Sequence, residues 1–369
     1  MHPTPNSEEI CMPAADSPAG SSQPASQASA TAVAMVSTDP GKRLVPRNIP
    51  LEGPRPGWVR VEVAASGVCH ADLEYAANPE ASEDNPVIPG HEIAGVIAEL
   101  GDEVQGWSIG DRVAVGWFGG SCGHCAFCRV GDVVHCAELQ VPGSSYPGGW
   151  AESVTVPASA LARIPEGMDF FDAAPMGCAG VTTFNAIRKA NLAPGATVAV
   201  LGIGGLGHLA LQFSNKMGFR TIAIARGAAR DGLARGLGAH DYIDTTAGPA
   251  GKALAEMGGA DLIVCTAQTT EPVSGLLAGL RPHGRLTLLG VDDGSITLPA
   301  AQLVMHELSV GGVVTGNTRD IEETMAFALR TGVRPLIERM PLESANEALE
   351  RIGAGNVAFR IALDATTQR

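Results

Sequence analysis

The chain has 369 residues, of which 45% are apolar and 17% are charged, and its formal net charge is −14. This length suits two domains of ordinary size, and the apolar content rules out a wholly disordered chain. The negative charge disfavours nucleic acid and anionic membrane surfaces as partners, and the apolar runs are too short to predict a membrane span. We therefore expect a small-molecule partner.

The first thirty residues are rich in Ser, Ala, Pro and Gln, and we expect residues 1–30 to form a disordered tail. This segment lacks the basic start and apolar stretch of a secretory signal and the Arg-rich character of a transit peptide. We therefore expect a cytoplasmic protein, and we interpret Cys11 in this tail as an incidental free thiol.

Short segments with β-strand character follow the tail, with Gly or Pro at nearly every junction between them. The pattern changes near residue 180 to apolar strands that alternate with helices, which indicates a parallel sheet covered on both faces. The expected β segments of the first part are 31–36, 58–67, 93–101, 111–120 and 152–156. The alternating part comprises 182–192, 197–202, 205–218, 221–225, 231–238, 241–244, 261–267, 273–280 and 285–290, and two helices (321–332 and 343–355) and a strand (359–364) close the chain.

A glycine-rich motif follows the apolar strand that begins at Thr197. It reads Gly202-Ile203-Gly204-Gly205-Leu206-Gly207 and fits G-x-G-x-x-G in the strand–turn–helix context that binds a dinucleotide. Gly202 permits the tight turn, Gly204 lets the backbone approach a pyrophosphate, and Gly207 lets the helix pack closely on the strand. Free N–H groups at the start of the helix then bind the phosphates.

The end of the next strand, 221–225, bears on which dinucleotide is bound. NAD-preferring sites usually place an acidic side chain there for the ribose 2′-hydroxyl, whereas this chain continues with Arg226. A guanidinium pairs with a 2′-phosphate, which a carboxylate would repel. We therefore predict that NADP(H) is preferred; a merely solvated Arg226 would leave NAD(H) equally acceptable.

Four of the eight cysteines lie within fifteen residues and predict a structural metal site. They are Cys122, Cys125, Cys128 and Cys136. Four thiolates so close together can surround one Zn²⁺ tetrahedrally and leave no open position for a substrate. Cys265, inside an expected apolar strand, is interpreted as structural.

A second, dispersed set of residues has the composition of a catalytic zinc site. Cys69 stands in GVCHADL, His91 in PGHE and Cys178 in MGCAG. Two thiolates and one imidazole leave a fourth position on zinc open for an alcohol or a carbonyl oxygen, which the metal would activate as a Lewis acid. Asp72 and Glu92 are the carboxylates expected beside these ligands, with Asp72 accepting the other N–H of His91.

These motifs occur in the order found in a known family. GVCHADL, PGHE, GDRV, the four-cysteine segment, CAGVTTFNA and VLGIGGLGHLALQ together make residues 31–369 resemble the zinc-containing medium-chain alcohol dehydrogenases, especially the bacterial and cinnamyl-alcohol groups. The resemblance implies an α/β fold. A GroES-like catalytic domain (31–180 and 315–369, with a structural zinc lobe at 119–140) is expected to flank a Rossmann domain (181–314), and the active site is expected in the cleft between them.

The resemblance also assigns individual residues and an assembly. Cys69, His91 and Cys178 are implied as ligands of the catalytic zinc, with Glu92 close enough to coordinate transiently. Other residues are assigned to the cofactor and the substrate, and a homodimer or homotetramer is expected. These residues are His70 and Arg360 beside the pyrophosphate, Thr182 beside the nicotinamide and Trp117 in the substrate pocket.

Two positions depart from the family pattern. The residue two after Cys69 is normally a Thr or Ser that passes on the alcohol proton, and here it is Ala71; the residue five after Cys69 is often His, and here it is Glu74. A methyl group cannot carry a proton, so water or Glu74 would have to substitute. Three functions stay open: an alcohol dehydrogenase, an NADPH-dependent reductase of an activated C=C bond, and an inactive cofactor-binding or interaction protein.

The hypothesis that the sequence favours is a zinc-dependent alcohol dehydrogenase. It would hold two Zn²⁺ ions per chain and pass a hydride between a primary alcohol or aldehyde and NADP(H). The identity of the alcohol does not follow from the sequence, because loops whose geometry the sequence leaves open form the pocket walls.

Overall fold

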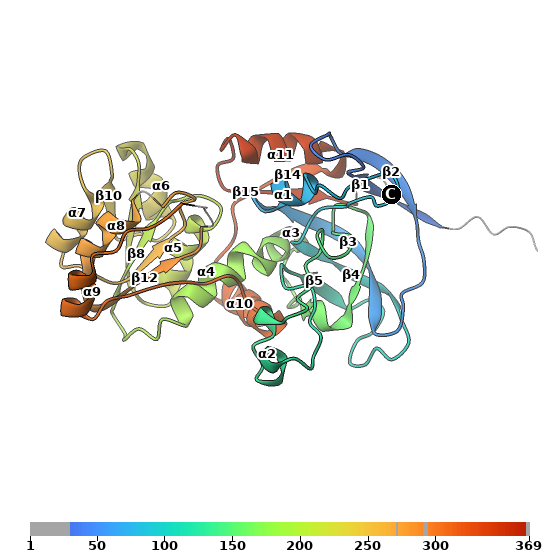
Figure 1. Ribbon diagram of the computed structural model, residues 1–369, viewed down its shortest axis with the longest axis horizontal. Coiled ribbons are helices and arrows are strands. Elements are labelled where there is room, and N and C mark those ends of the chain that lie inside the picture. Colours follow the sequence, from blue (N-terminus) through green and yellow to red (C-terminus); the bar gives the residue numbers. More distant parts are fainter. Residues whose placement is uncertain (1–29, 271, 291–293, 367–369) are drawn as a thin grey trace, which may run out of the picture.

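The computed structural model describes residues 30–270, 272–290 and 294–366. The chain forms two lobes that meet along a central junction (Figure 1). The expected tail, apart from its last residue, and Cys11 lie outside the described residues. In the part of the chain that the structure describes, no helix combines the length and the apolar character needed to cross a membrane.

A seven-stranded, mostly antiparallel sheet organises the first lobe. Strand β3 is central because it pairs with three neighbours, and its alternating buried residues Val59, Val61 and Val63 belong to the core. The order is β14 (Ile337–Pro341), β15 (Arg360–Asp364), β3 (Trp58–Val68), β4 (Ile93–Leu100), β5 (Arg112–Val115) and β7 (Leu161–Arg163), with β6 (Ser153–Pro157) also on β3. A separate antiparallel pair comprises β1 (Thr31–Val36) and β2 (Val45–Pro50).

A six-stranded parallel sheet organises the second lobe. Its order is β10 (Asp241–Asp244), β9 (Arg220–Ala225), β8 (Thr197–Leu201), β11 (Ala260–Cys265), β12 (Leu280–Leu288) and β13 (Ser309–Gly312). In chain order this is 3-2-1-4-5-6, so the direction of winding reverses between β8 and β11. In doubly wound sheets the ligand binds at this point, outside the carboxyl ends of the strands. All five residues of β8 are buried, which explains its uninterrupted apolar sequence.

Helices connect and cover these sheets. In the first lobe they are α1 (Asp72–Ala76), α2 (Ala126–Arg129), α3 (Phe170–Ala173) and α11 (Ala345–Gly353), and in the second α5 (Gly207–Lys216), α6 (Asp231–Gly236), α7 (Ala250–Glu256), α8 (Val273–Leu276) and α9 (Ala300–His306). Short 3₁₀ helices are η1 (Val133–His135), η2 (Ala158–Ala160), η3 (Ala174–Gly177), η4 (Ala228–Arg230), η5 (Leu277–Gly279) and η6 (Leu342–Ser344).

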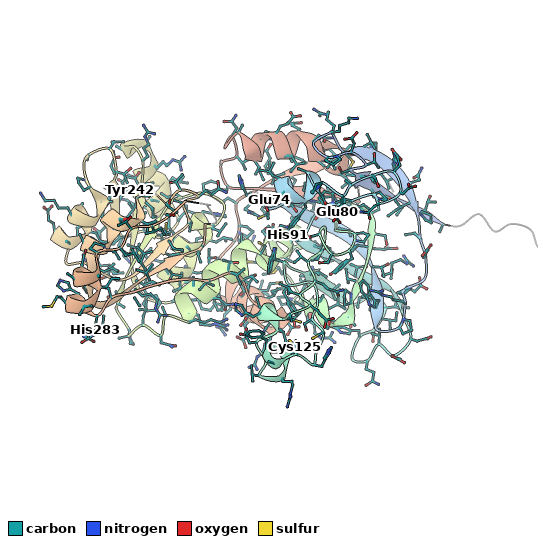
Figure 2. The ribbon with its side chains drawn as sticks, in the orientation of Figure 1. Glu74, Glu80, His91, Cys125, Tyr242 and His283 are labelled. Atoms are coloured by element: carbon teal, nitrogen blue, oxygen red, sulfur yellow. The ribbon has the colours of Figure 1, made fainter. Side chains whose placement is uncertain are left out.

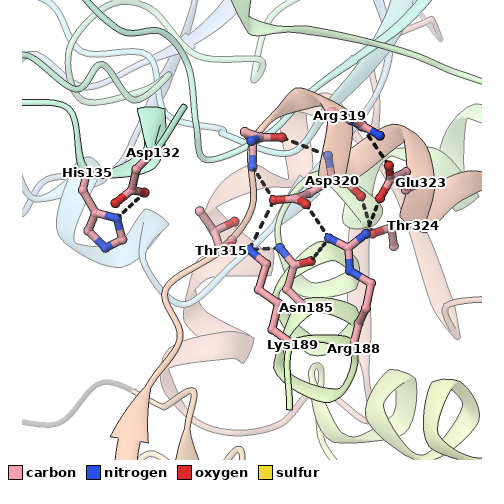
Figure 3. Close-up of polar contacts among 11 residues, drawn as sticks. Asp132, His135, Asn185, Arg188, Lys189, Thr315, Arg319, Asp320, Glu323 and Thr324 are labelled. Atoms are coloured by element: carbon pink, nitrogen blue, oxygen red, sulfur yellow. Dashed lines mark hydrogen bonds and ion pairs between the residues drawn. The ribbon is translucent and has the colours of Figure 1, made fainter. Parts of the chain in front are cut away.

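Two helices, α4 (Ala179–Arg188) and α10 (Thr318–Thr331), form the junction between the lobes (Figure 1). The ring of Phe184 in α4 contacts Phe213 of α5 and Phe327 of α10, with ring centroids 5.3 Å apart in both pairs. At the end of α4, Arg188 pairs with two carboxylates of α10 (Figure 3). The apolar contacts and the ion pairs together hold α4, and hence the residue before it, against both lobes.

The expected strands 31–36, 58–67 and 93–101 are confirmed as β1, β3 and β4, and the mixed α/β fold is the predicted one. Sequence reasoning missed β2, β7, β13 and β14. Strand β2 contains two prolines and β13 two glycines, residue types that weaken a strand signal. All four lie at the end of a sheet, where pairing on one side alone is enough to define them, and β7 has only three residues.

A close backbone contact fixes the start of the junction. Gly116 follows β5, and a Cβ atom placed there would lie 2.0 Å from the carbonyl oxygen of Gly177 in η3. Only glycine at position 116 therefore lets η3, and the residue Cys178 after it, approach the antiparallel sheet this closely.

We expect Gly116→Ala to lower the free energy of unfolding by about 1–3 kcal/mol, the usual effect of overpacking. Gly236→Ala is the matched control, because this helical glycine of α6 has no atom within 4 Å of an added Cβ. The control should be neutral or stabilising by up to about 1 kcal/mol. Urea denaturation measures both, and equal midpoints for the two variants would contradict the close contact.

Candidate active site

Strand register brings the dispersed cysteine and histidine residues together. Cys69 directly follows β3 and His91 stands two residues before β4, and the pairing of Ser66 with Ile93 puts these two strand ends side by side. Cys178 directly precedes α4. The ligand atoms of the four residues Cys69, His91, Glu92 and Cys178 all lie within 4.8 Å of one another. Figure 2 shows His91 inside the fold, near the junction of the lobes.

Asp72, the first residue of α1, orients this cluster. Its Oδ1 accepts a hydrogen bond from Nδ1 of His91 at 2.9 Å, and its Oδ2 accepts one from the backbone N–H of Cys69 at 2.8 Å. His91 and Asp72 are both fully buried. Burial lowers the pKa of His91, but the Asp72 carboxylate opposes this effect and the net pKa is raised. Because Nδ1 is bound to Asp72, the imidazole directs Nε2 into the cluster, where this atom has no hydrogen-bond partner among the described residues.

The two thiols of the cluster differ in acidity because each contacts the other. The contact with Cys178 lowers the pKa of Cys69 well below its usual value, and the same contact raises the pKa of Cys178. The two sulfurs and the unpartnered Nε2 of His91 therefore lie together in the geometry of a cation site. Two sulfurs, one imidazole and a carboxylate are a ligand set that fits Zn²⁺.

Glu92 joins this cluster to a cationic residue of β15. Its carboxylate pairs with the guanidinium of Arg360, and the exposed fractions of the two side chains are 0% and 5%. Burial raises the pKa of Glu92 to about 7, although the charge of Arg360 acts in the opposite direction. A Cβ at Gly67 would lie 2.0 Å from Oε2 of Glu92, so the space for this carboxylate depends on a glycine. Oε2 and Nε of Arg360 are unpartnered among the described residues.

The glycine-rich motif has the geometry that its sequence predicts. Gly202 has a φ of +92°, a Cβ at Gly204 would meet no atom within 4 Å, and a Cβ at Gly207 would lie 1.9 Å from the Gly202 carbonyl oxygen. Gly202 thus makes a tight turn, Gly204 leaves the backbone open to a ligand, and Gly207 lets the helix contact the turn closely. Ile203 is buried and Leu206 is half-buried. A Cβ at Gly205 would lie 3.2 Å from Nη1 of Arg360, so this guanidinium lies between the motif and the cysteine cluster.

Sequence reasoning missed His208, which follows the motif directly. Its Nδ1 donates to the Gly204 carbonyl at 3.0 Å and its Nε2 accepts from the Leu336 N–H at 3.1 Å. Burial lowers the pKa of His208 to about 4, which keeps the ring neutral as these two bonds require. His208 therefore connects the glycine-rich motif to the segment before β14. In the sequence, its position directly after the motif, in GLGH, could have indicated this role.

The other residues assigned to the cofactor lie in different surroundings. Thr182 is buried one turn into α4 and donates to the Val314 carbonyl at 3.2 Å, while His70 is exposed directly after Cys69. Arg226 is exposed at the start of the loop after β9. Sequence reasoning missed a carboxylate beside that loop. Asp244, at the end of the neighbouring β10, accepts a hydrogen bond from the Gly227 N–H at 2.8 Å.

A cavity of about 580 Å³ opens where β12 and β13 end. Two backbone segments line one side of it, 288–290 and 312–315, and the four-cysteine lobe lines another through residues 131–135. The hydroxyl of Thr315 on this lining is buried and unpartnered among the described residues. The polar residues that border the cavity, including the Asp132–His135 pair, appear in Figure 3.

Trp117 lies beside the cluster together with a residue that sequence reasoning missed. Its backbone N–H bonds to the Gly177 carbonyl at 3.3 Å, next to Cys178, and its indole N–H donates to the hydroxyl of Tyr75 at 2.9 Å. The Tyr75 ring stands edge-on to His91, with centroids 5.7 Å apart. The signal in the sequence was an aromatic residue six positions after Cys69.

The four nearby cysteines also come together, in a lobe that contains α2 and Cys125 (Figure 2). The sulfur of Cys136 lies 3.6 Å from that of Cys122 and 3.9 Å from that of Cys125, and Cys122 lies 4.0 Å from Cys128. Backbone N–H groups point at the sulfurs of Cys122 and Cys136. This arrangement fits a closed tetrahedral site for one Zn²⁺.

Comparisons with known proteins agree with this architecture. Residues 55–166 match the family described as alcohol dehydrogenase GroES-like domain, and residues 205–330 match the family described as zinc-binding dehydrogenase. Alcohol dehydrogenase notN of Aspergillus sp. (strain MF297-2) is 40% identical over 320 residues, which cover 87% of this chain and 94% of that protein. An alcohol dehydrogenase of Geobacillus stearothermophilus is 35% identical over 309 residues, which cover 83% and 91%.

A solved structure gives the same result. The cinnamyl alcohol dehydrogenase SbCAD4 of Sorghum bicolor superposes with a TM-score of 0.83 at 29% identity, covering 92% of this chain and 98% of that one. The catalytic and dinucleotide-binding parts thus match in sequence and in fold. The chain belongs to the zinc-containing medium-chain alcohol dehydrogenases and is an oxidoreductase that acts on alcohols.

Proposed function

We propose that this protein is a zinc-dependent dehydrogenase that interconverts a primary alcohol and its aldehyde and prefers NADP(H). The observation that carries the proposal is the cluster of Cys69, His91, Cys178 and Glu92 beside Arg360, which in turn adjoins the glycine-rich motif. Because one buried cation links the proposed metal ligands to the dinucleotide motif, a reacting oxygen and a nicotinamide bound there would share one site.

The residues of the cluster would hold Zn²⁺ through Cys69, His91 and Cys178. The bound ion supplies Lewis acidity, which lowers the pKa of an alcohol or polarises a carbonyl. Asp72 keeps His91 in the tautomer that presents Nε2, and Glu92 offers a further oxygen ligand. The second ion, held by Cys122, Cys125, Cys128 and Cys136, would stabilise the lobe that borders the cavity.

The dinucleotide would lie along the carboxyl ends of the parallel strands. The glycine-rich motif and Arg360 would bind the pyrophosphate, with His70 nearby, and Thr182 would adjoin the nicotinamide near the end of β13. Arg226 supports a preference for the 2′-phosphate of NADP(H) because its guanidinium is exposed after β9. A homodimer or homotetramer stays a prediction.

The alternative function, reduction of an activated C=C bond, is motivated by residue 71. Ala71 is half-buried directly before α1, and Glu74 is exposed on that helix (Figure 2). The position that normally carries the proton-relay hydroxyl therefore presents a methyl group.

Reduction of cinnamaldehyde tests the proposal against this alternative. We expect cinnamyl alcohol as the product, formed faster with NADPH than with NADH, because the metal ligands are arranged to activate a carbonyl oxygen. The product is identified by chromatography and the rate by nicotinamide absorbance. Saturated aldehyde as the product would assign the protein to C=C reduction instead.

The two metal sites should respond differently to loss of a ligand. Cys69→Ser should lower turnover by more than roughly 100-fold with little change in Tm, because it removes a ligand at the reacting centre. Cys125→Ser should lower Tm by roughly 5 °C or more, because the zinc bound by the four cysteines would stabilise the four-cysteine lobe. Elemental analysis should find two zinc ions in the parent and one in each variant. Equal Tm losses for the two variants would contradict the assignment of roles.

Arg226→Ala should weaken NADPH binding roughly tenfold, the loss expected for charge-assisted hydrogen bonds worth about 1.5 kcal/mol. Binding of NADH, which lacks the 2′-phosphate, should stay within about twofold by the same argument. Arg235→Ala on α6 is the control, since its guanidinium already pairs with Asp231 at 2.9 Å. Titration of protein fluorescence measures the NADPH and NADH affinities of the parent and both variants, and an unchanged NADPH-to-NADH ratio in Arg226→Ala would show that this residue does not select the cofactor.

A further inference from the structure

Tyr75 is a phenol at the metal-ligand cluster to which the proposed mechanism gives no role. It lies on α1, three residues after Asp72, and its ring stands edge-on to His91 at an interplanar angle of 79°. The Tyr75 side chain is half-buried, whereas His91 is fully buried.

The hydrogen bonding of Tyr75 leaves one proton free. The indole N–H of Trp117 donates to the Tyr75 oxygen at 2.9 Å, so the hydroxyl acts as an acceptor in this bond. Indole N–H is a donor only, which fixes the direction of the bond. Within the described residues the structure gives the Tyr75 proton no acceptor. The tyrosine is thus held in place by Trp117 while its own donor capacity remains unused.

Close to Tyr75, the chain lacks a hydroxyl that the family normally has, because residue 71 is Ala. Ala71 stands one helical turn before Tyr75, and the two are linked by the Tyr75 N–H to Ala71 carbonyl bond at 3.3 Å. Side chains four residues apart lie on the same face of a helix. A hydrogen-bond donor at position 75 can therefore reach the same side of the cluster that a hydroxyl at position 71 would face.

We propose that the Tyr75 hydroxyl donates a hydrogen bond to the reacting oxygen of the substrate, in place of the hydroxyl that Ala71 lacks, and that Trp117 holds it in position. This inference rests on the proposed alcohol–aldehyde function. As a hydride arrives at the carbonyl carbon, negative charge develops on the oxygen, and a neutral donor already aimed at that oxygen stabilises the charge. The proton that completes the alcohol comes from solvent water, so Tyr75 stays neutral throughout.

Tyr75→Phe tests the proposal because it removes only the hydroxyl and keeps the ring against His91. The turnover number for cinnamaldehyde should fall roughly 100-fold, the usual loss for one donor to a developing oxyanion. KM should change less, and zinc content and Tm should not change. Tyr146→Phe is the matched control, since its hydroxyl donates to the Gly119 carbonyl at 2.8 Å and is given no part in the reaction.

A rescue variant separates this role from a structural one. Ala71→Thr restores the missing hydroxyl, and in the Tyr75→Phe background it should recover roughly tenfold of the lost turnover, a coupling expected between groups that share one partner. In the parent the same substitution should change turnover far less. No recovery in the double variant would overturn the idea that the two positions serve the same oxygen.

A binding measurement tests the contact without turnover. Cinnamamide carries an unreactive carbonyl oxygen, and its affinity for the protein–NADPH complex should fall about fivefold in Tyr75→Phe, as for one hydrogen bond. NADPH affinity itself should not change. Parent-like amide affinity and turnover in Tyr75→Phe would overturn the role of Tyr75, as would a loss of zinc or of Tm that accounts for the change. A parent that binds the amide but yields no cinnamyl alcohol would instead contradict the proposed function.

Discussion

A buried contact between Glu92 and Arg360 connects the two halves of the site. Removing two opposite charges from water is unfavourable unless they pair closely, and this pair lies at exposed fractions of 0% and 5%. Its geometry depends on Gly67, which leaves room for the carboxylate, and on Gly205, which the guanidinium approaches. Because Glu92 adjoins His91 and Arg360 adjoins the dinucleotide motif, this contact sets the position of the Cys–His cluster relative to that motif.

The junction helices also hold the two lobes in a fixed relative position. Cys178 directly precedes α4, which packs through Phe184 on both lobes and ends in the ion pairs of Arg188. The position of Cys178, a proposed metal ligand, therefore depends on contacts made along the whole helix. His208 makes a second connection between lobes by binding Leu336, and its buried, neutral ring suits that role.

The substrate side of the site depends on side chains rather than on the metal ligands. Family membership explains the candidate ligands and the dinucleotide motif, whereas Ala71 stands where the family normally has Thr or Ser, and Tyr75 lies one helical turn after it. A methyl group at position 71 and a phenol one turn later keep one donor near the cluster but move it along α1. The chemistry on this side of the site therefore depends on individual side chains and does not follow from the fold alone.

The sequence by itself determined the features whose parts are close together in the chain. The four-cysteine lobe and the glycine-rich motif each lie within a short segment, so local backbone geometry is enough to assemble them, and the apolar strands that alternate with helices identified the parallel sheet. The tertiary structure decided the contacts between distant residues, such as Glu92 with Arg360, 268 positions apart, and Trp117 with Tyr75, 42 positions apart. Such contacts depend on strand register and helix packing, because a shift of one residue in a strand turns every side chain to the opposite face.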